Sequence, residues 1–408
     1  MKVNTPRIKT HIDELSAFTA TPGKGVTRLT YSQEDKQARE YIKAKMSDYG
    51  LQVSEDGIGN IFGKLQAENN DAPSVIVGSH FDSVPHGGAY DGTAGVVVGL
   101  EVAALFQEEQ IKPTVPLEII AMVEEEGTRF GGGLMGSRSI VGDITDEELD
   151  TVQDKDGISL RTAMEANKLN PDVPRKRAGE TIKAFLEMHI EQGPILEDKN
   201  IPIGIVQSIT GITQLEISVK GQAGHAGTTP MNQRADALLP ASEIISKLPA
   251  LASEIGKGMV ITTGSLQVYP NGANVIPGEV VFTVDIRSDE EYDILQAIEN
   301  VKELVYSFNR NKIDTKIEQK TYIPPKALNP SIRELLRTQS EKLQIPYDTI
   351  NSGAGHDAMV LSDITDTGMV FIPSKNGLSH CPEEWSSAED IAFSAAILFE
   401  ASKTLTLE

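Results

Sequence analysis

The sequence predicts an α/β fold, in which a catalytic domain with a mixed, largely parallel-core sheet and helices on both faces carries a smaller inserted α+β domain. First, the chain has 408 residues, more than the roughly 250–300 residues at which a single core stops growing. Second, short apolar runs alternate with helical stretches in the first half, as in strand–helix–strand units. Third, the order of the expected strands and helices changes near residue 209, and the earlier pattern returns after the Pro324-Pro325 pair.

The first part of the chain alternates between helical and strand patterns. Residues 34–49 place Ala38, Ile42 and Met46 at helical spacing. The elements expected next are strands at 51–53, 61–65 and 75–77, a helix at about 92–109, and strands at 116–123 and 185–190. The strand–helix–strand order from residue 75 to 123 indicates neighbouring parallel strands. The charged stretch 143–180 is poor in apolar side chains, so we expect short helices and loops there.

Residues 211–324 are expected to form a separate domain in the order strand, helix, strand, strand, helix, strand. The strands are expected at 215–219, 260–268, 280–286 and 313–320, and the helices at 231–254 and 289–309. That order is the split unit of a ferredoxin-like domain. The chain then returns to a helix (330–343), a strand (347–351) and a helix (388–404). We therefore predict a discontinuous catalytic domain, residues 1–210 and 325–408, with residues 211–324 inserted as a lid and dimerisation domain.

The composition excludes several classes of function. The 37 basic and 59 acidic residues give a net charge of −22, which argues against binding to nucleic acid or to anionic membrane surfaces. The single cysteine, Cys381, excludes an internal disulfide framework and is typical of a reducing compartment. The first residues lack the apolar core of a signal peptide, and no apolar run approaches the roughly 20 residues that span a bilayer. We expect a cytoplasmic protein without a membrane partner.

A glycine-rich stretch follows the apolar run 75–77 and contains His80, Asp82 and Asp91. A histidine and an aspartate on a loop at the carboxyl end of a strand can bind a metal. Asp82 is placed to accept the second ring N–H of His80 and so to fix its tautomer. The alternative is a polar surface loop whose glycines only form turns. The choice depends on whether the chain supplies further ligands.

Acids and histidines also follow two other apolar runs. The glutamates 124–126 come directly after the strand expected at 116–123. Consecutive carboxylates usually mark a solvated surface, but several unpaired buried carboxylates are very costly without a cation. Neighbouring side chains of an extended segment point to opposite sides, so one glutamate can face a metal while the next faces the substrate as a general base. His189 ends the strand expected at 185–190, and His380 lies in a loop near the carboxyl terminus.

Together these segments supply enough ligands for two metal ions. The candidate ligands are His80, Asp91, one of the three glutamates, His189 and His380. Three imidazoles and two carboxylates suit two divalent ions that share one bridging carboxylate, and imidazole favours zinc, nickel or manganese. Two ions about 3.5–4 Å apart can hold a water between them and lower its pKa toward neutrality. For His11 and His86 we expect structural roles.

A series of short motifs extends over nearly the whole chain. They are Gly78-Ser-His-Phe-Asp-Ser83, Gly87-Gly-Ala-Tyr-Asp-Gly92, Glu125-Glu-Gly-Thr-Arg-Phe130, Met188-His-Ile-Glu-Gln-Gly-Pro194, Gly224-His-Ala-Gly-Thr-Thr-Pro230, Asn274-Val-Ile-Pro277, Asp285-Ile-Arg287, Ser352-Gly-Ala-Gly-His-Asp357 and Leu378-Ser-His380. In these motifs and in their order, the chain resembles the amidase, hydantoinase and carbamoylase branch of the M20 metallopeptidase-like superfamily. Peptidases of the wider superfamily usually have a carboxylate where this chain has His189. The resemblance therefore points to the carbamoylase branch.

The resemblance implies the roles of the metal-site residues. It implies that one ion is held by His80, Asp91 and His189, and the other by Asp91, Glu126 and His380. It also implies that Glu125 is the general base, because in this family the base is the glutamate directly before the ligand. The expected cofactors are two divalent metal ions, with zinc expected first and manganese, nickel or cobalt as alternatives.

The resemblance also implies substrate contacts. His225 would bind the substrate and stabilise the oxyanion of the tetrahedral intermediate, from its own subunit or from the partner subunit of a homodimer. The planar fork of Arg287 suits bidentate capture of a substrate carboxylate, and the alternative is a structural ion pair with Asp285 or Asp289. The remaining expected substrate-binding residues are Gln192, Asn274, Gly353 and His356. The alternative for His356 is that it only braces the metal ligands.

The function predicted from these residues is hydrolysis of a linear amide C–N bond in a ureido compound that carries a carboxylate. The expected substrate is an N-carbamoyl-L-amino acid or allantoate. Glu125 would take a proton from the attacking water and pass it to the leaving nitrogen. One alternative is an M20-type peptidase or N-acyl-amino-acid deacylase with the same metals. An alternative of another class is a metal-dependent binding protein without catalytic activity.

Overall fold

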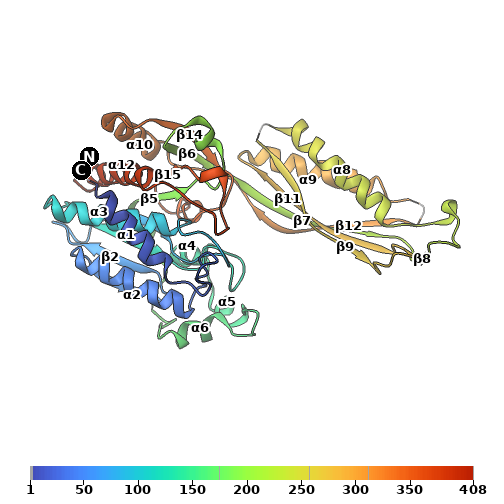
Figure 1. The fold of residues 1–408 in the computed structure, drawn as a ribbon, viewed down its shortest axis with the longest axis horizontal. Helices are drawn as coiled ribbons and strands as arrows, with labels where there is room; N and C mark the ends of the chain where they lie inside the picture. The colour runs from blue at the N-terminus through green and yellow to red at the C-terminus, as the bar shows by residue number, and fades with distance from the viewer. Residues whose placement is uncertain (1–2, 174, 257, 311, 408) are drawn as a thin grey trace. The chain divides into compact units, whose positions relative to one another are not determined.

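The computed structural model describes residues 3–173, 175–256, 258–310 and 312–407, and the chain divides into two compact units (Figure 1). The first unit comprises Met1–Gln207, Leu328–Ser352 and His356–Glu408. The second comprises Ser208–Ala327 and Gly353–Gly355. Each helix among the described residues is too short or too polar to cross a lipid bilayer.

A mixed sheet forms the centre of the first unit. In spatial order its strands are β1 (Gln52–Glu55), β2 (Ile61–Leu65), β4 (Leu117–Met122), β3 (Ser74–His80), β5 (Ile182–Ile190), β15 (Thr367–Ile372) and β6 (Ile203–Ile209), and β14 (Tyr347–Ser352) pairs with β6. The neighbouring strands β4, β3, β5 and β15 are parallel, and the flanking pairs β1–β2, β2–β4 and β15–β6 are antiparallel. The predicted mixed α/β fold with a largely parallel core is confirmed.

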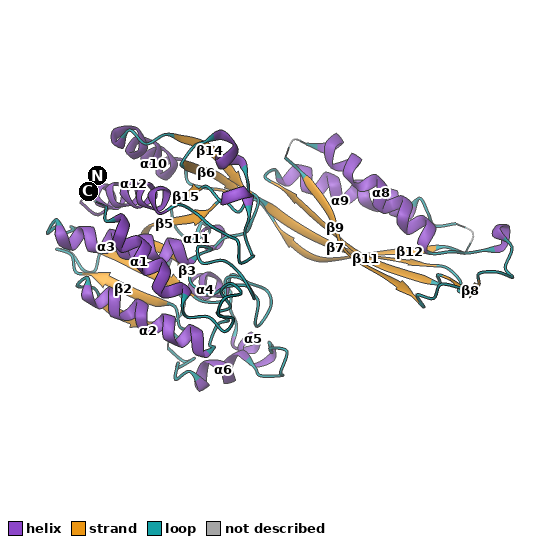
Figure 2. Ribbon diagram, viewed as in Figure 1, coloured by secondary structure: helices purple, strands orange, loops and turns teal. Residues whose placement is uncertain are grey.

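Helices cover both faces of this sheet (Figure 2). The helices of this unit are α1 (Thr5–Ser16), α2 (Gln33–Asp48), α3 (Thr93–Glu108), α4 (Met135–Val141), α5 (Asp146–Thr151), α6 (Leu160–Ala166), α7 (Ile195–Lys199), α10 (Pro330–Leu343), α11 (Asp357–Leu361) and α12 (Ala388–Leu407). On one face, α1, α3 and α12 share a buried apolar cluster with side chains such as Val77 and Leu186. On the other face, the backbone N–H of Ala358 at the start of α11 donates to the buried Glu187 carboxylate of β5 (3.0 Å).

Local sequence explains where several helices begin. The Asn329 side chain accepts hydrogen bonds from the backbone N–H groups of Ser331 and Ile332, and Pro330 occupies the first turn of α10, where its missing N–H costs nothing. Helix α3 follows Gly92, whose positive φ of 57° suits glycine. Because α3 is buried along almost its whole length, its apolar residues hold it in the centre of the unit.

The second unit is an antiparallel sheet covered on one face by two helices. Its strands in spatial order are β12 (Asp314–Ile323), β7 (Gly211–Lys220), β11 (Glu279–Ser288) and β9 (Val260–Tyr269), and its helices are α8 (Leu238–Ile255) and α9 (Glu291–Tyr306). The chain order β7, α8, β9, β11, α9, β12 is that of a split β-α-β unit. Two short pairs accompany it: β8 (Gly224–His225) with β10 (Val275–Ile276), and β13 (Lys326–Ala327) with the end of β6. The lid and dimerisation roles expected for this unit stay predictions.

The helix expected over 231–254 begins later in the structure. Only Met231–Gln233 form a short 3-10 turn, and α8 starts at Leu238. Between them Arg234 has an extended backbone, and the carbonyl oxygen of Ala235 accepts a hydrogen bond from the N–H of Gln222 (2.7 Å) in an isolated antiparallel bridge. A long-range backbone pairing therefore overrides the local helical pattern.

Candidate metal centre

The carboxyl ends of three neighbouring parallel strands carry the candidate ligands. His80 is the last residue of β3, His189 lies next to the last residue of β5, and the glutamates 124–126 follow β4. Within each of three groups, the ligand atoms lie within 4.8 Å of one another: His80, Asp91 and His189; Asp91, Glu126 and His380; and His80, Glu125 and Glu126. The structure thus brings together every side chain that the sequence marked as a ligand.

The buried Asp91 carboxylate stands between three imidazoles. Its Oδ1 lies 3.5 Å from His80 Nε2 and 3.1 Å from His189 Nε2. Its Oδ2 lies 3.1 Å from His380 Nε2. Burial alone would raise the pKa of Asp91, but hydrogen bonds with the three histidines hold it well below its usual range. Asp91 thus presents one oxygen to each of two neighbouring groups of ligands, which is the arrangement a bridging carboxylate requires.

The three consecutive glutamates point in different directions. Glu124, with φ 51°, is buried, and its Oε1 accepts hydrogen bonds from the backbone N–H groups of Arg129 (3.0 Å) and Phe130 (2.8 Å). Glu124 therefore anchors the following loop. Glu125 Oε2 lies 3.8 Å from His80 Nε2, whereas Glu126 Oε2 lies 3.5 Å from the Nε2 of His380.

Asp82 holds the backbone of this glutamate segment. Its two carboxylate oxygens accept hydrogen bonds from the N–H groups of Glu125 (3.1 Å) and Glu126 (3.2 Å). Its Oδ1 is also 3.5 Å from His80 Nδ1, longer than an ordinary hydrogen bond to nitrogen. The contact that the sequence predicted for Asp82 is thus present but long, and its bonds to the glutamate backbone were not foreseen.

The chemistry of the ligand group fits a cation. Burial, followed by repulsion from Asp91, raises the pKa of Glu126 to about 7. Burial also raises the pKa of Glu125 well above its usual range. Among the described residues, the buried Glu126 Oε1 has no hydrogen-bond partner. Buried carboxylates and unpartnered polar atoms are costly, and divalent metal ions would supply the missing charge and contacts.

Two further predicted site residues lie against the ligands. The Gln192 side chain places Nε2 2.8 Å from Asp91 Oδ2 and 3.2 Å from the Nε2 of His380. His356 is buried, with its ring centroid 4.4 Å from that of His189 and its Nε2 2.9 Å from Ser352 Oγ. These contacts match the alternative in which His356 braces a ligand. Substrate binding by Gln192 and His356 stays a prediction.

The other predicted substrate residues belong to the second unit. His225 is exposed, and its Nδ1 accepts hydrogen bonds from the backbone N–H groups of Gly227 (3.0 Å) and Thr228 (3.2 Å), which leaves the proton on Nε2. The ion pair considered as the alternative role of Arg287 is present, because its Nε lies 2.8 Å from Asp285 Oδ1.

The last two predicted substrate residues have different surroundings, because Gly353 contacts Arg287 whereas the Asn274 carbonyl oxygen accepts a hydrogen bond from the backbone N–H of Ala226 (2.9 Å), next to His225. Gly353 accepts a hydrogen bond through its carbonyl oxygen from Arg287 Nη1 (3.1 Å), and Asn274 is exposed. The substrate roles of His225, Arg287, Asn274 and Gly353 stay predictions.

The two histidines expected to be structural are not among the candidate ligands of the described residues. His11 is buried, with Nδ1 2.6 Å from the Tyr41 hydroxyl and Nε2 2.8 Å from the Tyr49 hydroxyl. His86 is exposed, and its Nδ1 lies 2.9 Å from the carbonyl oxygen of Lys24.

Glu187 is a site residue that the sequence analysis did not identify. It is fully buried in β5, two residues before His189, and its carboxylate accepts hydrogen bonds from Ser79 Oγ (2.6 Å) and from the backbone N–H of Ala358 (3.0 Å). It thus connects β5 to the strand that carries His80 and to α11. A charged residue inside the apolar run 185–190 was the signal that could have revealed it.

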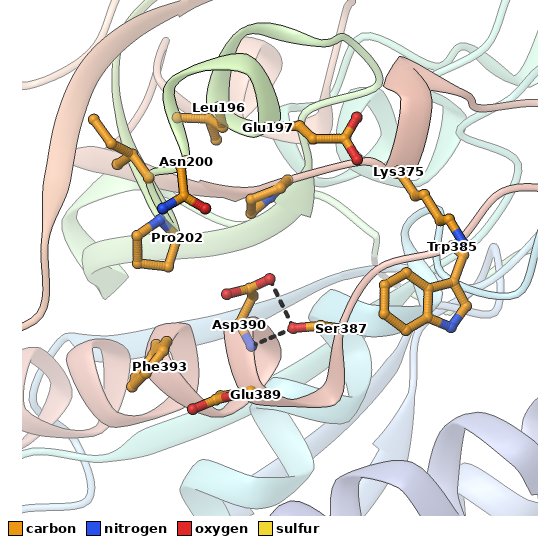
Figure 3. A pocket seen from close by; sticks show the side chains of 12 residues that line it. Leu196, Glu197, Asn200, Pro202, Lys375, Trp385, Ser387, Glu389, Asp390 and Phe393 are labelled. Carbon is orange, nitrogen blue, oxygen red and sulfur yellow. Dashed lines mark hydrogen bonds between the residues drawn. The ribbon is translucent and has the colours of Figure 1, made fainter.

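A surface cavity of about 390 Å³ is lined in part by Lys375 and Trp385, which flank the loop that carries His380 (Figure 3). Its lining includes Trp385, Phe393 and Leu196. The Trp385 side chain is 47% exposed, and Lys375 Nζ lies 5.5 Å from the centroid of its ring. None of the predicted site residues lines this cavity, so the cavity is separate from the candidate metal centre.

Comparisons with known proteins agree with this arrangement. The sequence pattern of the family described as "Peptidase family M20/M25/M40" matches residues 76–404. The chain is 43% identical over 407 residues to an N-carbamoyl-L-amino-acid amidohydrolase of Paenarthrobacter aurescens, covering 99% of this chain and 98% of the relative. It is 33% identical to an allantoate amidohydrolase of Bacillus subtilis, covering 94% and 93%. The crystal structure of an amidase of the hydantoinase/carbamoylase family from Burkholderia multivorans superimposes with a TM-score of 0.92 at 35% identity, covering 100% and 99%.

Proposed function

Because the chain belongs to peptidase family M20/M25/M40, we propose that it is a metal-dependent amidohydrolase that cleaves a linear amide C–N bond of a ureido compound. An N-carbamoyl-L-amino acid is the first candidate substrate, because the relative with 43% identity bears that name. Allantoate is the second, since an allantoate amidohydrolase is also similar over nearly the full length. The observation that carries the proposal is the buried Asp91 carboxylate, which presents one oxygen to His80 and His189 and the other to His380.

The proposed cofactors are two divalent ions, zinc first, with manganese, nickel or cobalt as alternatives. One would be held by His80, Asp91 and His189, and the other by Asp91, Glu126 and His380. When bound, the ions would lower the pKa of a water toward neutrality and polarise the substrate carbonyl.

Glu125 is the proposed general base. Its burial, together with repulsion from Asp357, Glu126 and Asp82, raises its affinity for a proton. In the proposed reaction Glu125 accepts a proton from the attacking water as the water oxygen bonds to the carbamoyl carbon. It then donates that proton to the leaving nitrogen as the C–N bond breaks. Asp82 keeps Glu125 in position through the backbone N–H.

The contacts of two side chains support their proposed roles in substrate binding. His225 is proposed to stabilise the oxyanion, because its Nδ1 accepts backbone N–H groups and its Nε2 is left as a donor. Arg287 is proposed to bind the substrate carboxylate, while its Nε stays paired with Asp285. The other proposed substrate contacts are Gln192, Asn274, Gly353 and His356.

We also propose that the protein is a homodimer in the cytoplasm. The single cysteine, which is typical of a reducing compartment, supports the location. Light scattering coupled to size-exclusion chromatography tests the dimer: a mass twice that of the chain is expected, and a monomer at micromolar concentration contradicts it.

A substrate panel separates this proposal from its alternatives. The zinc-loaded protein is assayed with N-carbamoyl-L-amino acids, allantoate, N-acetyl-L-amino acids and dipeptides, with release of amine or ammonia measured for each. Turnover of a ureido substrate at least tenfold above the others is expected. Turnover of only peptides or acetylated amino acids would assign the peptidase or deacylase function, and binding without turnover of any substrate would assign the binding protein.

A further inference from the structure

We propose that Glu384 is a positioning residue that ties the loop carrying Asp91 to the loop carrying His380, so that these two ligands meet at one ion. The inference deepens the proposed function, because it rests on the same pair of metal sites. Glu384 stands outside every group of ligand atoms described above, so its effect would be exerted through its neighbours.

One buried carboxylate contacts both loops. Glu384 is 4% exposed, and its Oε1 accepts hydrogen bonds from the backbone N–H groups of Tyr90 and Asp91, both at 3.0 Å. Its Oε2 accepts from Ser379 Oγ (2.9 Å) and from the backbone N–H of His380 (3.3 Å). Asp91 and Glu384 are 293 positions apart in the chain, so this carboxylate joins two segments that no local structure links.

The His380 loop depends on such a contact at its tip. His380 has a positive φ of 58°, which is unfavourable for a residue with a side chain. Its side chain is 49% exposed, so packing alone does not hold it. The base of the loop is closed by hydrogen bonds from Lys375 N to Trp385 O (2.9 Å) and from Ser386 Oγ to Pro373 O (2.7 Å). Trp385 and Lys375 line the surface cavity (Figure 3), whereas the intervening Glu384 is buried.

Gly88 supplies an independent argument. A Cβ at this position would lie 2.1 Å from Glu384 Oε1 and 2.2 Å from its Cδ. It would also lie 2.4 Å from the Cβ of Glu384, so a methyl group there cannot be accommodated unless the whole Glu384 side chain moves. Gly88→Ala therefore displaces the Glu384 carboxylate without removing any charge or hydrogen-bonding group from the site.

The test compares Glu384→Ala, Glu384→Gln and Gly88→Ala with the wild type, and with Glu383→Ala, which removes the neighbouring exposed carboxylate, as the matched control. Each full-length protein is equilibrated at a series of buffered free zinc concentrations, and bound zinc per chain is measured by mass spectrometry. Circular dichroism and thermal unfolding of the metal-free proteins report whether each variant folds. The visible spectrum of the cobalt-substituted proteins reports the geometry around the ions.

Two ions are expected for the wild type and for Glu383→Ala. In Glu384→Ala and Gly88→Ala the ion of Asp91, Glu126 and His380 is expected to bind about 10–100-fold more weakly, the usual cost of losing a partner of a metal ligand. The ion of His80, Asp91 and His189 is expected to lose less affinity, because it shares only Asp91 with the segments that Glu384 contacts. Glu384→Gln keeps one acceptor oxygen and a similar size, so an intermediate loss at the same ion is expected.

The outcomes separate the inference from the proposed function. A wild type that binds fewer than two ions contradicts the two-ion site itself. A wild type with two ions, together with folded Glu384 variants that keep both affinities, overturns only the positioning role. Equal weakening of both ions also overturns it, because that is the result of a general structural defect. If Glu384→Ala does not fold, Gly88→Ala and Glu384→Gln decide the question by the same criterion.

Discussion

Gly92 is the position at which a single methyl group should disrupt the metal centre most directly. A Cβ on Gly92 would lie 2.3 Å from both Cε1 and Nε2 of His80 and 2.4 Å from its Cδ2. These distances are far below van der Waals contact, so Gly92→Ala must displace either the imidazole of a candidate ligand or the start of α3.

The expected magnitude has two parts. Gly92 has a positive φ of 57°, and a residue with a side chain in such a conformation costs about 1–3 kcal/mol. Overpacking a filled interior costs a further ~1–3 kcal/mol. We therefore expect Gly92→Ala to lower the free energy of unfolding by about 2–6 kcal/mol. Because His80 is a direct candidate ligand, zinc affinity should fall by more than the about 10–100-fold typical of outer partners.

Gly157→Ala is the matched control. Gly157 also has a positive φ, 76°, but nothing lies within 4 Å of its Cβ position. Gly157→Ala should lower the free energy of unfolding by only about 1–2 kcal/mol, the cost of a left-handed backbone, and the variant should keep its zinc. The assay is urea unfolding of the metal-free proteins together with zinc content at fixed free zinc. A Gly92→Ala protein that keeps two ions and full activity, or a Gly157→Ala protein that loses zinc equally, would refute the reasoning.

Three further predictions concern pH, metal removal and Asp82. Burial lowers the pKa of His11 to about 4, so the stability contributed by its neutral form is fully present above about 6.5 and is lost as pH falls from 6.5 to 4. The free energy of unfolding should therefore fall by about 2 kcal/mol less between pH 7 and pH 4 in His11→Phe than in the wild type, after allowance for partial solvent screening. Urea unfolding at the two pH values measures this difference, and an equal fall in both proteins would rule the prediction out. Chelation should lower the melting temperature reversibly, because an ion at 100 times its Kd stabilises the folded state by about 2.7 kcal/mol; a melting temperature indifferent to chelator and zinc contradicts a bound ion. Asp82→Ala removes the acceptor for the N–H groups of Glu125 and Glu126 and should lower kcat/KM by about 10–100-fold in a folded protein, whereas unaltered kinetics would show that Asp82 does not position these residues.

Most of the central sheet could be predicted because buried parallel strands are continuous apolar runs. The strand 61–65 and the helix 330–343 have the predicted bounds. The strands β6 and β15 were not predicted, because a short apolar run has no periodicity that separates a strand from a helix. The predicted start of α8 was wrong, because the preceding segment pairs with Gln222 through Ala235, and the local sequence does not reveal such a long-range contact.

His80, His189 and the glutamates 124–126 were identifiable as candidate ligands because they lie at the end of buried apolar runs or directly after them, and carboxyl ends of parallel strands meet at one edge of a sheet. Asp91 and His380 lie in loops and were identified from the polar, glycine-containing segments around them. The roles of Glu124 and Glu384 could not be identified from the sequence, because they depend on the direction of the local backbone and on distant contacts. The inward turn of Glu124 depends on its φ of 51°, which the sequence does not reveal. Glu384 resembles a solvated surface acid beside Glu383, and its partner Asp91 is 293 positions away.

The most direct test of the central claim is the activity of Glu125→Gln loaded with zinc. Glutamine keeps the shape of the side chain but cannot accept the proton of the attacking water. We expect kcat with an N-carbamoyl-L-amino acid to fall by about 10²–10⁴-fold, the usual contribution of general acid–base catalysis, while both ions stay bound and KM changes little. A Glu125→Gln protein that binds two ions and hydrolyses the substrate at the wild-type rate would contradict the account.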